Sequence, residues 1–113
     1  MTQPDTTVWI VMTSAPNREI AQGIARALVD ARAAACVNVM SACISIYRWQ
    51  GKIETADEVP LFIKTTESRY PEVERLIRSL HPYELPEIVA VPAGRGLPGY
   101  LSWVTEATSA GND

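Results

Sequence analysis

The chain's single histidine lies in the segment SLHPYELPEI, residues 79–88, beside a tyrosine and two glutamates. An imidazole can bind a metal ion or transfer a proton, but it also occurs where a helix ends before a proline. We predict that a helix ends at His81–Pro82, with a cationic ring at the protein surface facing the last helical carbonyls. As metal ligands, the imidazole of His81 and the carboxylate of Glu87 would form a weak, unselective copper site. We therefore expect chiefly a turn, with weak surface affinity for copper or another divalent cation.

Other motifs that could carry chemistry lack the context they need. Residues 94–99, GRGLPG, match the glycine pattern of a dinucleotide-binding loop, but no strand ending in an acidic residue follows, which favours a turn. No cysteine pair has metal-finger spacing, and no serine motif points to His81 as a catalytic base. The carboxylates of Glu54, Asp57 and Glu58 are typical of a charged strand edge. We expect no catalytic residue, no required cofactor and no enzymatic activity.

Aromatic side chains leave a further possibility open. Those that could line a cleft are Tyr47, Trp49, Tyr83, Tyr100 and Trp103. Such residues more often fill a core or an interface than hold a cofactor, because they combine a large apolar surface with one polar atom. We therefore favour an interface.

The composition is that of an ordinary globular protein, with 113 residues of which 47% are hydrophobic and 20% charged. This length predicts one domain, residues 1–113. The net charge of −3 argues against a nucleic-acid partner. No segment approaches the ~18 apolar residues that span a membrane, and residues 1–7 lack the positive start and apolar stretch of a leader. We expect a cytoplasmic protein with no membrane partner.

The two cysteines, Cys36 and Cys43, lie on one predicted extended segment. At about 3.3 Å per residue they would be on the order of 20 Å apart, too far for a disulfide. We expect both to be reduced, as in the cytoplasm, and to pack as small hydrophobic side chains on apolar strand segments.

Hydrophobic periodicity and turn residues predict the order strand, helix, strand, strand, helix, strand, followed by a short helix. The predicted strands are residues 8–13, 36–49, 52–66 and 87–92. The first helix runs from a cap at Asn17 to about Ala33, the second is capped by Ser68 with Pro71 in its first turn, and the last covers residues 100–107.

The two middle strands should form a long hairpin around a short turn at Gln50–Gly51. Ser41 and Ala42 indicate a bend or bulge in its first strand. Pro60 has no N–H to donate, so it predicts an edge position or a bulge in the second.

This element order predicts an α+β fold, the ferredoxin-like split βαβ sandwich with an antiparallel sheet. The first strand is apolar on both sides, since Val8, Ile10 and Met12 alternate with Trp9 and Val11. Strands that are apolar on both faces must be covered on both, and the helices of one chain cover one face. We expect another subunit to cover the second face.

Several phrases, in this order, resemble the CutA family of divalent-cation tolerance proteins. They are W-x-G-K-I at residues 49–53, K-T-T at 64–66 and H-P-Y-x-x-P-E at 81–87, within a resemblance from about Val8 to Val104. The resemblance implies a ferredoxin-like subunit in a homotrimer whose long hairpins pair between subunits. It also implies a non-catalytic role in tolerance of, or response to, copper and other divalent ions.

The resemblance further implies where copper would bind. Family members that bind copper use a cysteine before the T-A-P turn and two adjacent histidines before P-Y. The matching positions here are Thr13, Leu80 and His81, so only the last ligand is present. The alternative is a PII-like trimeric signalling protein that binds a nucleotide or small molecule in clefts between subunits. Such proteins usually carry a long mobile loop, whereas the predicted hairpin turn has only Gln50 and Gly51.

Overall fold

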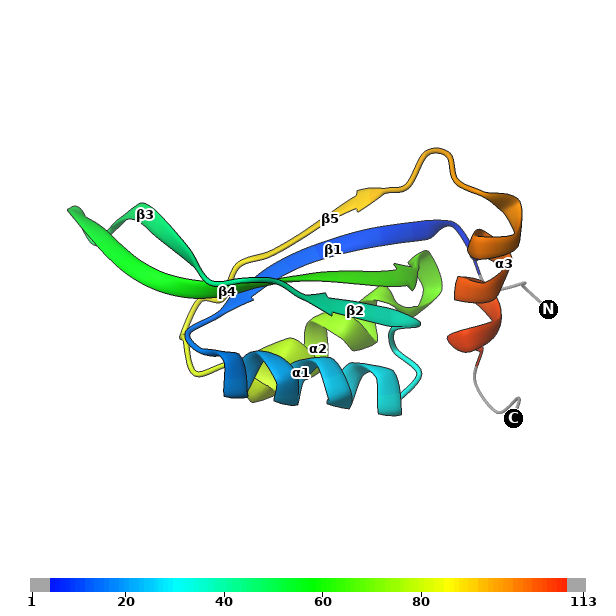
Figure 1. Cartoon of the computed structure of the whole chain (residues 1–113), viewed down its shortest axis with the longest axis horizontal. Coiled ribbons are helices and arrows are strands. Elements are labelled where there is room, and N and C mark those ends of the chain that lie inside the picture. The colour runs from blue at the N-terminus through cyan, green and yellow to red at the C-terminus, as the bar shows by residue number, and fades with distance from the viewer. Residues whose placement is uncertain (1–4, 110–113) are drawn as a thin grey trace.

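The computed structural model describes residues 5–109, and Figure 1 shows the arrangement of its elements. The strands are β1 (Val8–Ala15), β2 (Cys36–Val39), β3 (Cys43–Trp49), β4 (Lys52–Thr66) and β5 (Ile88–Pro92). The helices are α1 (Arg18–Asp30), α2 (Tyr70–Leu80) and α3 (Pro98–Ala107), with a 3-10 turn η1 (Glu67–Arg69) before α2. Residues 1–4 and 110–113 belong to the predicted domain but lie outside the described residues. The same holds for the first part of residues 1–7, for which we expected no leader. Within them, no helix is long and apolar enough to cross a membrane.

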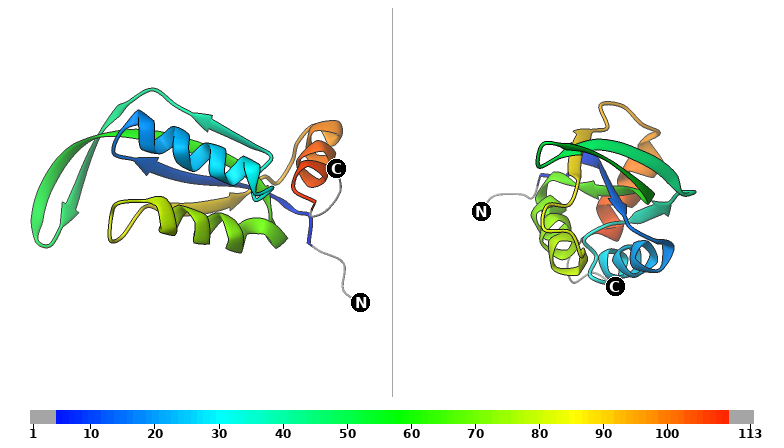
Figure 2. Two further views of the ribbon diagram at one scale, coloured as in Figure 1. Left: turned by 90° about the horizontal axis from the view of Figure 1, so that it is seen from below. Right: turned by 90° about the vertical axis from the view of Figure 1, so that its left-hand side faces the viewer.

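The sheet has the order β2-β4-β1-β5, and β3 pairs with the outer part of β4. Every pairing is antiparallel. This confirms the predicted α+β split βαβ arrangement. Helices α1 and α2 lie side by side on one face of the sheet, the β3–β4 hairpin projects at one end, and α3 lies at the opposite end (Figures 1 and 2).

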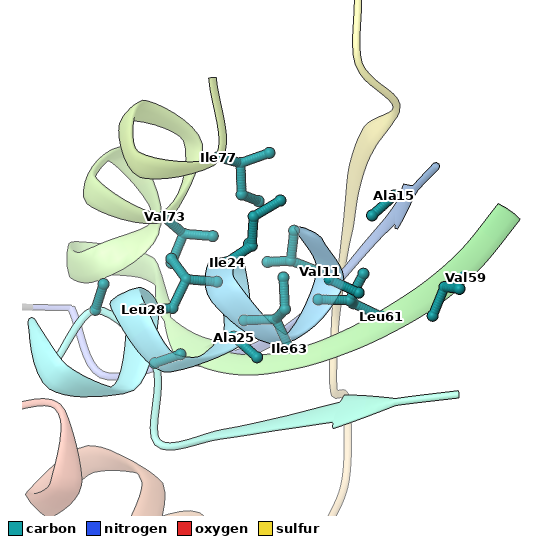
Figure 3. Packing of buried hydrophobic residues seen from close by; sticks show 13 residues of the cluster. Val11, Ala15, Ile24, Ala25, Leu28, Val59, Leu61, Ile63, Val73 and Ile77 are labelled. Atoms are coloured by element: carbon teal, nitrogen blue, oxygen red, sulfur yellow. The ribbon is translucent and has the colours of Figure 1, made fainter. Parts of the chain in front are cut away.

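The core lies between the sheet and helices α1 and α2, as Figure 3 shows. Its largest side chains come from Ile24 and Leu28 of α1, Ile77 of α2, and Leu61 and Ile63 of β4, all essentially without solvent exposure. The helical ones recur at intervals of three or four residues, so they share one face. Burying each contributes roughly 1.5–3 kcal/mol relative to leaving it exposed.

The two long helices begin in different ways. Asn17 caps α1 as predicted, because its side-chain oxygen accepts a hydrogen bond from the Ile20 N–H at 2.8 Å. The predicted cap of α2 at Ser68 is wrong, since that residue lies in η1 and the helix begins at Tyr70. Pro71 is in the first turn of α2, as expected, where a missing N–H breaks no helical hydrogen bond.

Helix α1 ends at Asp30, before the predicted end at Ala33. The chain leaves the helix because Arg32 adopts the left-handed conformation, with φ of 58°. The guanidinium of Arg69 donates hydrogen bonds to the carbonyl oxygens of Ala31 at 3.1 Å and Arg32 at 3.2 Å. A cation is favourable at these exposed carbonyls, and here it also joins the end of α1 to the start of α2.

A bulge separates β2 from β3. Residues 40–42 lie opposite residues 59–60 of β4, so the first hairpin strand carries one extra residue there. The edge position predicted from Pro60 is wrong, because β4 lies between β2 and β1. The extra residue lies in the opposite strand, where Ser41 and Ala42 indicated a bend or bulge, and not in the strand of Pro60. Met40 N–H donates to the Pro60 carbonyl at 2.9 Å. The backbone nitrogen and carbonyl of Pro60 therefore both face the bulge at residues 40–42. The N–H that proline lacks would lie there, where no regular ladder hydrogen bond is lost.

One face of the sheet keeps apolar side chains that are partly exposed to solvent. Phe62 points away from the helices, because it alternates along β4 with buried Leu61 and Ile63. On β5, Val89 and Val91 are also exposed. We call Phe62, Val89 and Val91 the bare sheet face.

The hairpin carries a second exposed apolar surface. Its turn is the predicted Gln50–Gly51, and both residues have positive φ, as in the turns that match strand twist. Ile44, Ile46 and Ile53 share one face of the two strands, and each is 67–71% exposed. We call these three the hairpin isoleucines.

Leu28→Ala should lower the free energy of unfolding by about 2–5 kcal/mol, because it leaves a cavity between α1 and the sheet. The adjacent Val29 is 44% exposed, so Val29→Ala should change it by no more than about 0.5 kcal/mol. Urea denaturation at one fixed protein concentration measures both. Equal effects of the two substitutions would contradict the placement of the core.

Candidate functional site

His81 is buried, with 7% of its surface exposed, and each of its two ring nitrogens forms a hydrogen bond. Nε2 lies 2.6 Å from the Ser14 carbonyl oxygen, and Nδ1 lies 3.1 Å from the Tyr83 backbone nitrogen. A carbonyl can only accept and an amide N–H can only donate, so Nε2 carries the proton and Nδ1 does not. The predicted cationic surface ring is therefore wrong. A neutral imidazole joins the end of α2 to β1.

The side chains around His81 do not fit a copper centre. A metal ion needs an imidazole lone pair, and the one at Nδ1 accepts a hydrogen bond. The hydroxyl of Thr13, at the position of the family's cysteine, donates to the Glu87 backbone oxygen at 2.6 Å, and Leu80 is an exposed apolar side chain. Among residues 5–109, no three His, Cys, Asp or Glu side chains gather closely enough to hold a metal ion. Weak binding at His81 and Glu87 stays a prediction.

A cavity of about 750 Å³ lies beside this turn, where the hairpin meets the segment that leads into β5. Three aromatic rings line it, those of Tyr47, Trp49 and Tyr83. The aromatic cleft considered from the sequence therefore exists in part. Tyr100 and Trp103 lie elsewhere, together on α3, with ring centroids 5.6 Å apart.

Three carboxylates also line the cavity, those of Glu58, Glu84 and Glu87. Glu58 is only 6% exposed, so the expectation of a charged strand edge fails for it, although Glu54 and Asp57 are exposed. Alternation along β4 places Asp57 on the face of buried Val59 and Leu61, and Glu58 on the face of exposed Phe62, so it gives no sequence signal for the burial of Glu58.

Tyr83 is the polar neighbour of Glu58. Partial burial, together with the negative charge and hydrogen bonding of the Glu58 carboxylate, raises the pKa of Tyr83 above its ordinary value. The tyrosine therefore stays protonated through neutral pH. The backbone of Tyr83 is connected to β1 through the ring of His81.

Both cysteines are free, as predicted. Cys36 is half-buried, next to the Tyr100 hydroxyl, and burial and this thiol raise the pKa of Tyr100. Cys43 is exposed, so its predicted packing as a buried hydrophobic side chain is wrong for the single chain.

The glycine-rich segment is a turn, as predicted. Gly94 has φ of 69°, a conformation that favours glycine. A Cβ on Gly96 would come within 2.8 Å of the Leu101 side chain, so a side chain there would displace the first turn of α3. The helix begins at Pro98, inside the segment.

The fold and the site define a split βαβ subunit with a long projecting hairpin and a cavity lined by aromatic and acidic residues. In this subunit, a buried histidine links the end of α2 to β1 by a hydrogen bond. Residues 9–107 match the family model described as CutA1 divalent ion tolerance protein. The chain belongs to this family.

Solved structures and sequence relatives agree with this assignment. The divalent cation tolerance protein of Thermus thermophilus superimposes with a TM-score of 0.88 at 43% identity, over 90% of this chain and 99% of that one. CutA of Xylella fastidiosa gives 0.89 at 41%, over 91% and 99%. Protein CutA of Homo sapiens is 46% identical over 98 residues, 87% of this chain but 55% of the human protein. The chain thus spans about half the length of this relative.

His81→Ala should lower the free energy of unfolding by about 1–3 kcal/mol, because it leaves the Ser14 carbonyl and the Tyr83 N–H without partners. Ser79→Ala, at an exposed position of the same helix, should have a much smaller effect. Urea denaturation compares the two. Calorimetric titration with Cu(II) gives a second readout, in which both wild type and His81→Ala should bind weakly. Binding tighter than about 1 μM that vanishes in His81→Ala would contradict the structural role of the ring.

Proposed function

We propose that the chain functions as a non-catalytic homotrimer in the tolerance of divalent metal ions, copper among them. Membership of the divalent ion tolerance family supports the role in metal tolerance. The observation that carries the rest is the apolar surface that one chain leaves uncovered. The cytoplasm is the compartment that two free cysteines favour.

The bare sheet face supports an obligate assembly. Val89 is 51% exposed in the single chain, and Phe62 and Val91 are exposed beside it. A contiguous apolar surface of this kind marks an interface, and interfaces that never separate are large and apolar. The number three comes from the family resemblance.

The hairpin isoleucines support pairing of hairpins between subunits. They lie beyond α1 and α2, where the β3–β4 ribbon projects alone (Figure 1). A lone two-stranded ribbon is marginally stable in water, so a neighbouring subunit would stabilise it. PII-like proteins usually carry a long mobile loop, whereas this hairpin turn has two residues, Gln50–Gly51. We therefore keep PII-like nucleotide signalling as the second candidate function.

Phe62→Lys should separate the subunits, because it places a charge in the proposed interface, which would have to lose its water. Val29→Lys is the control, since it adds the same charge to the outer surface of α1. Light scattering on a sizing column should give the mass of a trimer for wild type and control, and a lower mass for Phe62→Lys. A monomer mass for wild type at micromolar concentration, or an unchanged mass for Phe62→Lys, would contradict the assembly.

The tolerance role can be tested by growth of the source organism in graded Cu(II) after removal of the gene. Loss of the gene should lower the copper concentration that halves growth, and the wild-type gene should restore it. The Val29→Lys gene should restore it equally, and the Phe62→Lys gene poorly, if the assembled form is the active one. Unchanged growth without the gene, in copper and in other divalent ions, would contradict the proposal.

A further inference from the structure

The cavity beside His81 contains a buried carboxylate, that of Glu58, which has no cationic partner among residues 5–109. Glu58 is more than nine-tenths buried, and its polar neighbour is the Tyr83 hydroxyl. Within residues 5–109, no Lys or Arg forms an ion pair with it; the ion pair found there joins Arg75 to Glu72. A buried carboxylate costs several kcal/mol unless a cation or several hydrogen bonds compensate. Glu58 lines the cavity, so a cation that enters the cavity from outside the chain can compensate the charge of its carboxylate.

The lining indicates which kind of cation fits. Glu58, Glu84 and Glu87 all face the cavity, yet no three acidic, His or Cys side chains of the described chain gather closely enough for one metal ion. Separated carboxylates suit a cation whose charge is spread over a larger body. The volume of about 750 Å³ is in the ordinary range for small-molecule sites.

The aromatic walls favour an organic cation over an inorganic one. Tyr47, Trp49 and Tyr83 line the cavity, and each ring is 37–40% exposed in the single chain. An ammonium or guanidinium over such a ring gains roughly 0.5–2 kcal/mol, and its carbon body gains contact with the same apolar surface. Strongly hydrated metal ions lack that carbon body. The three rings and the buried carboxylate of Glu58 together form an aromatic cage that contains a negative charge.

We propose that this cavity binds an alkylammonium or guanidinium group, with Glu58 as its charge partner and the rings of Tyr47 and Trp49 as its walls. Tyr83 contributes a third ring to the lining. The cation comes from a free small molecule or from a Lys or Arg side chain of another copy of the chain. The recognition chemistry is the same in both cases. The inference does not depend on the role in metal tolerance.

Calorimetric titration of the assembled protein with butylguanidinium tests the proposal, and butylurea is the uncharged probe of the same shape. Butylguanidinium should bind, and butylurea should bind roughly tenfold more weakly or not at all. Glu58→Gln keeps the side-chain shape and should lose about tenfold in affinity for butylguanidinium. Trp49→Leu, at a half-exposed ring, should also bind more weakly. Glu106→Gln removes an exposed carboxylate of α3, outside the cavity lining, and should bind as wild type.

The outcomes distinguish the two sources of the cation. Binding of butylguanidinium that requires Glu58 identifies a free ligand. No binding, combined with assembly that weakens in Glu58→Gln and not in Glu106→Gln, identifies a basic side chain of another copy. Equal affinity for butylurea and butylguanidinium would overturn the proposal. So would the absence of binding together with a Glu58→Gln variant that assembles and unfolds as wild type does.

Discussion

Alternation along a strand sends successive side chains to opposite faces of a sheet, and in β1, β4 and β5 both sets include apolar residues. Helices α1 and α2 cover one set, which forms the core of Figure 3. The other set, represented by Phe62 and Val89, stays 39% and 51% exposed in the single chain. Burial of apolar surface is the largest favourable term in folding, and this set is the reason we propose that other copies of the chain cover the sheet. In such an assembly, stability would depend on protein concentration.

The long strand β4 connects the core to the proposed interface. Its inner half, paired with β1 and β2, supplies Leu61 and Ile63 to the core, whereas its outer half pairs only with β3 and leaves the body of the molecule. Pro60 lies at the boundary between the halves, opposite the bulge. Such bulges bend a strand and increase its twist. The cavity is found at this boundary, because there the projecting ribbon turns past the segment that follows α2.

Features encoded by neighbouring residues could be predicted from the sequence, and those that depend on distant contacts could not. The cap at Asn17, the turn at Gln50–Gly51 and the order of helices and strands along the chain follow from local turn chemistry and periodicity. The segment H-P-Y indicated the end of α2 correctly, but not that His81 would meet the Ser14 carbonyl, which lies 67 positions away in the chain. In the same way, Glu58 belongs to a run of charges that looks exposed, yet it is buried beside residues 83–87, which are distant in the chain.

The central claim is that other copies of the chain cover the bare sheet face, and hydroxyl-radical footprinting of the protein at micromolar concentration tests it most directly. Phe62 is 39% exposed and Leu97 75% exposed in the single chain. If the face is covered, Phe62 should be labelled far more slowly than its exposure implies, while Leu97, outside the bare sheet face, provides the reference. Labelling of Phe62 in proportion to its single-chain exposure would contradict the account.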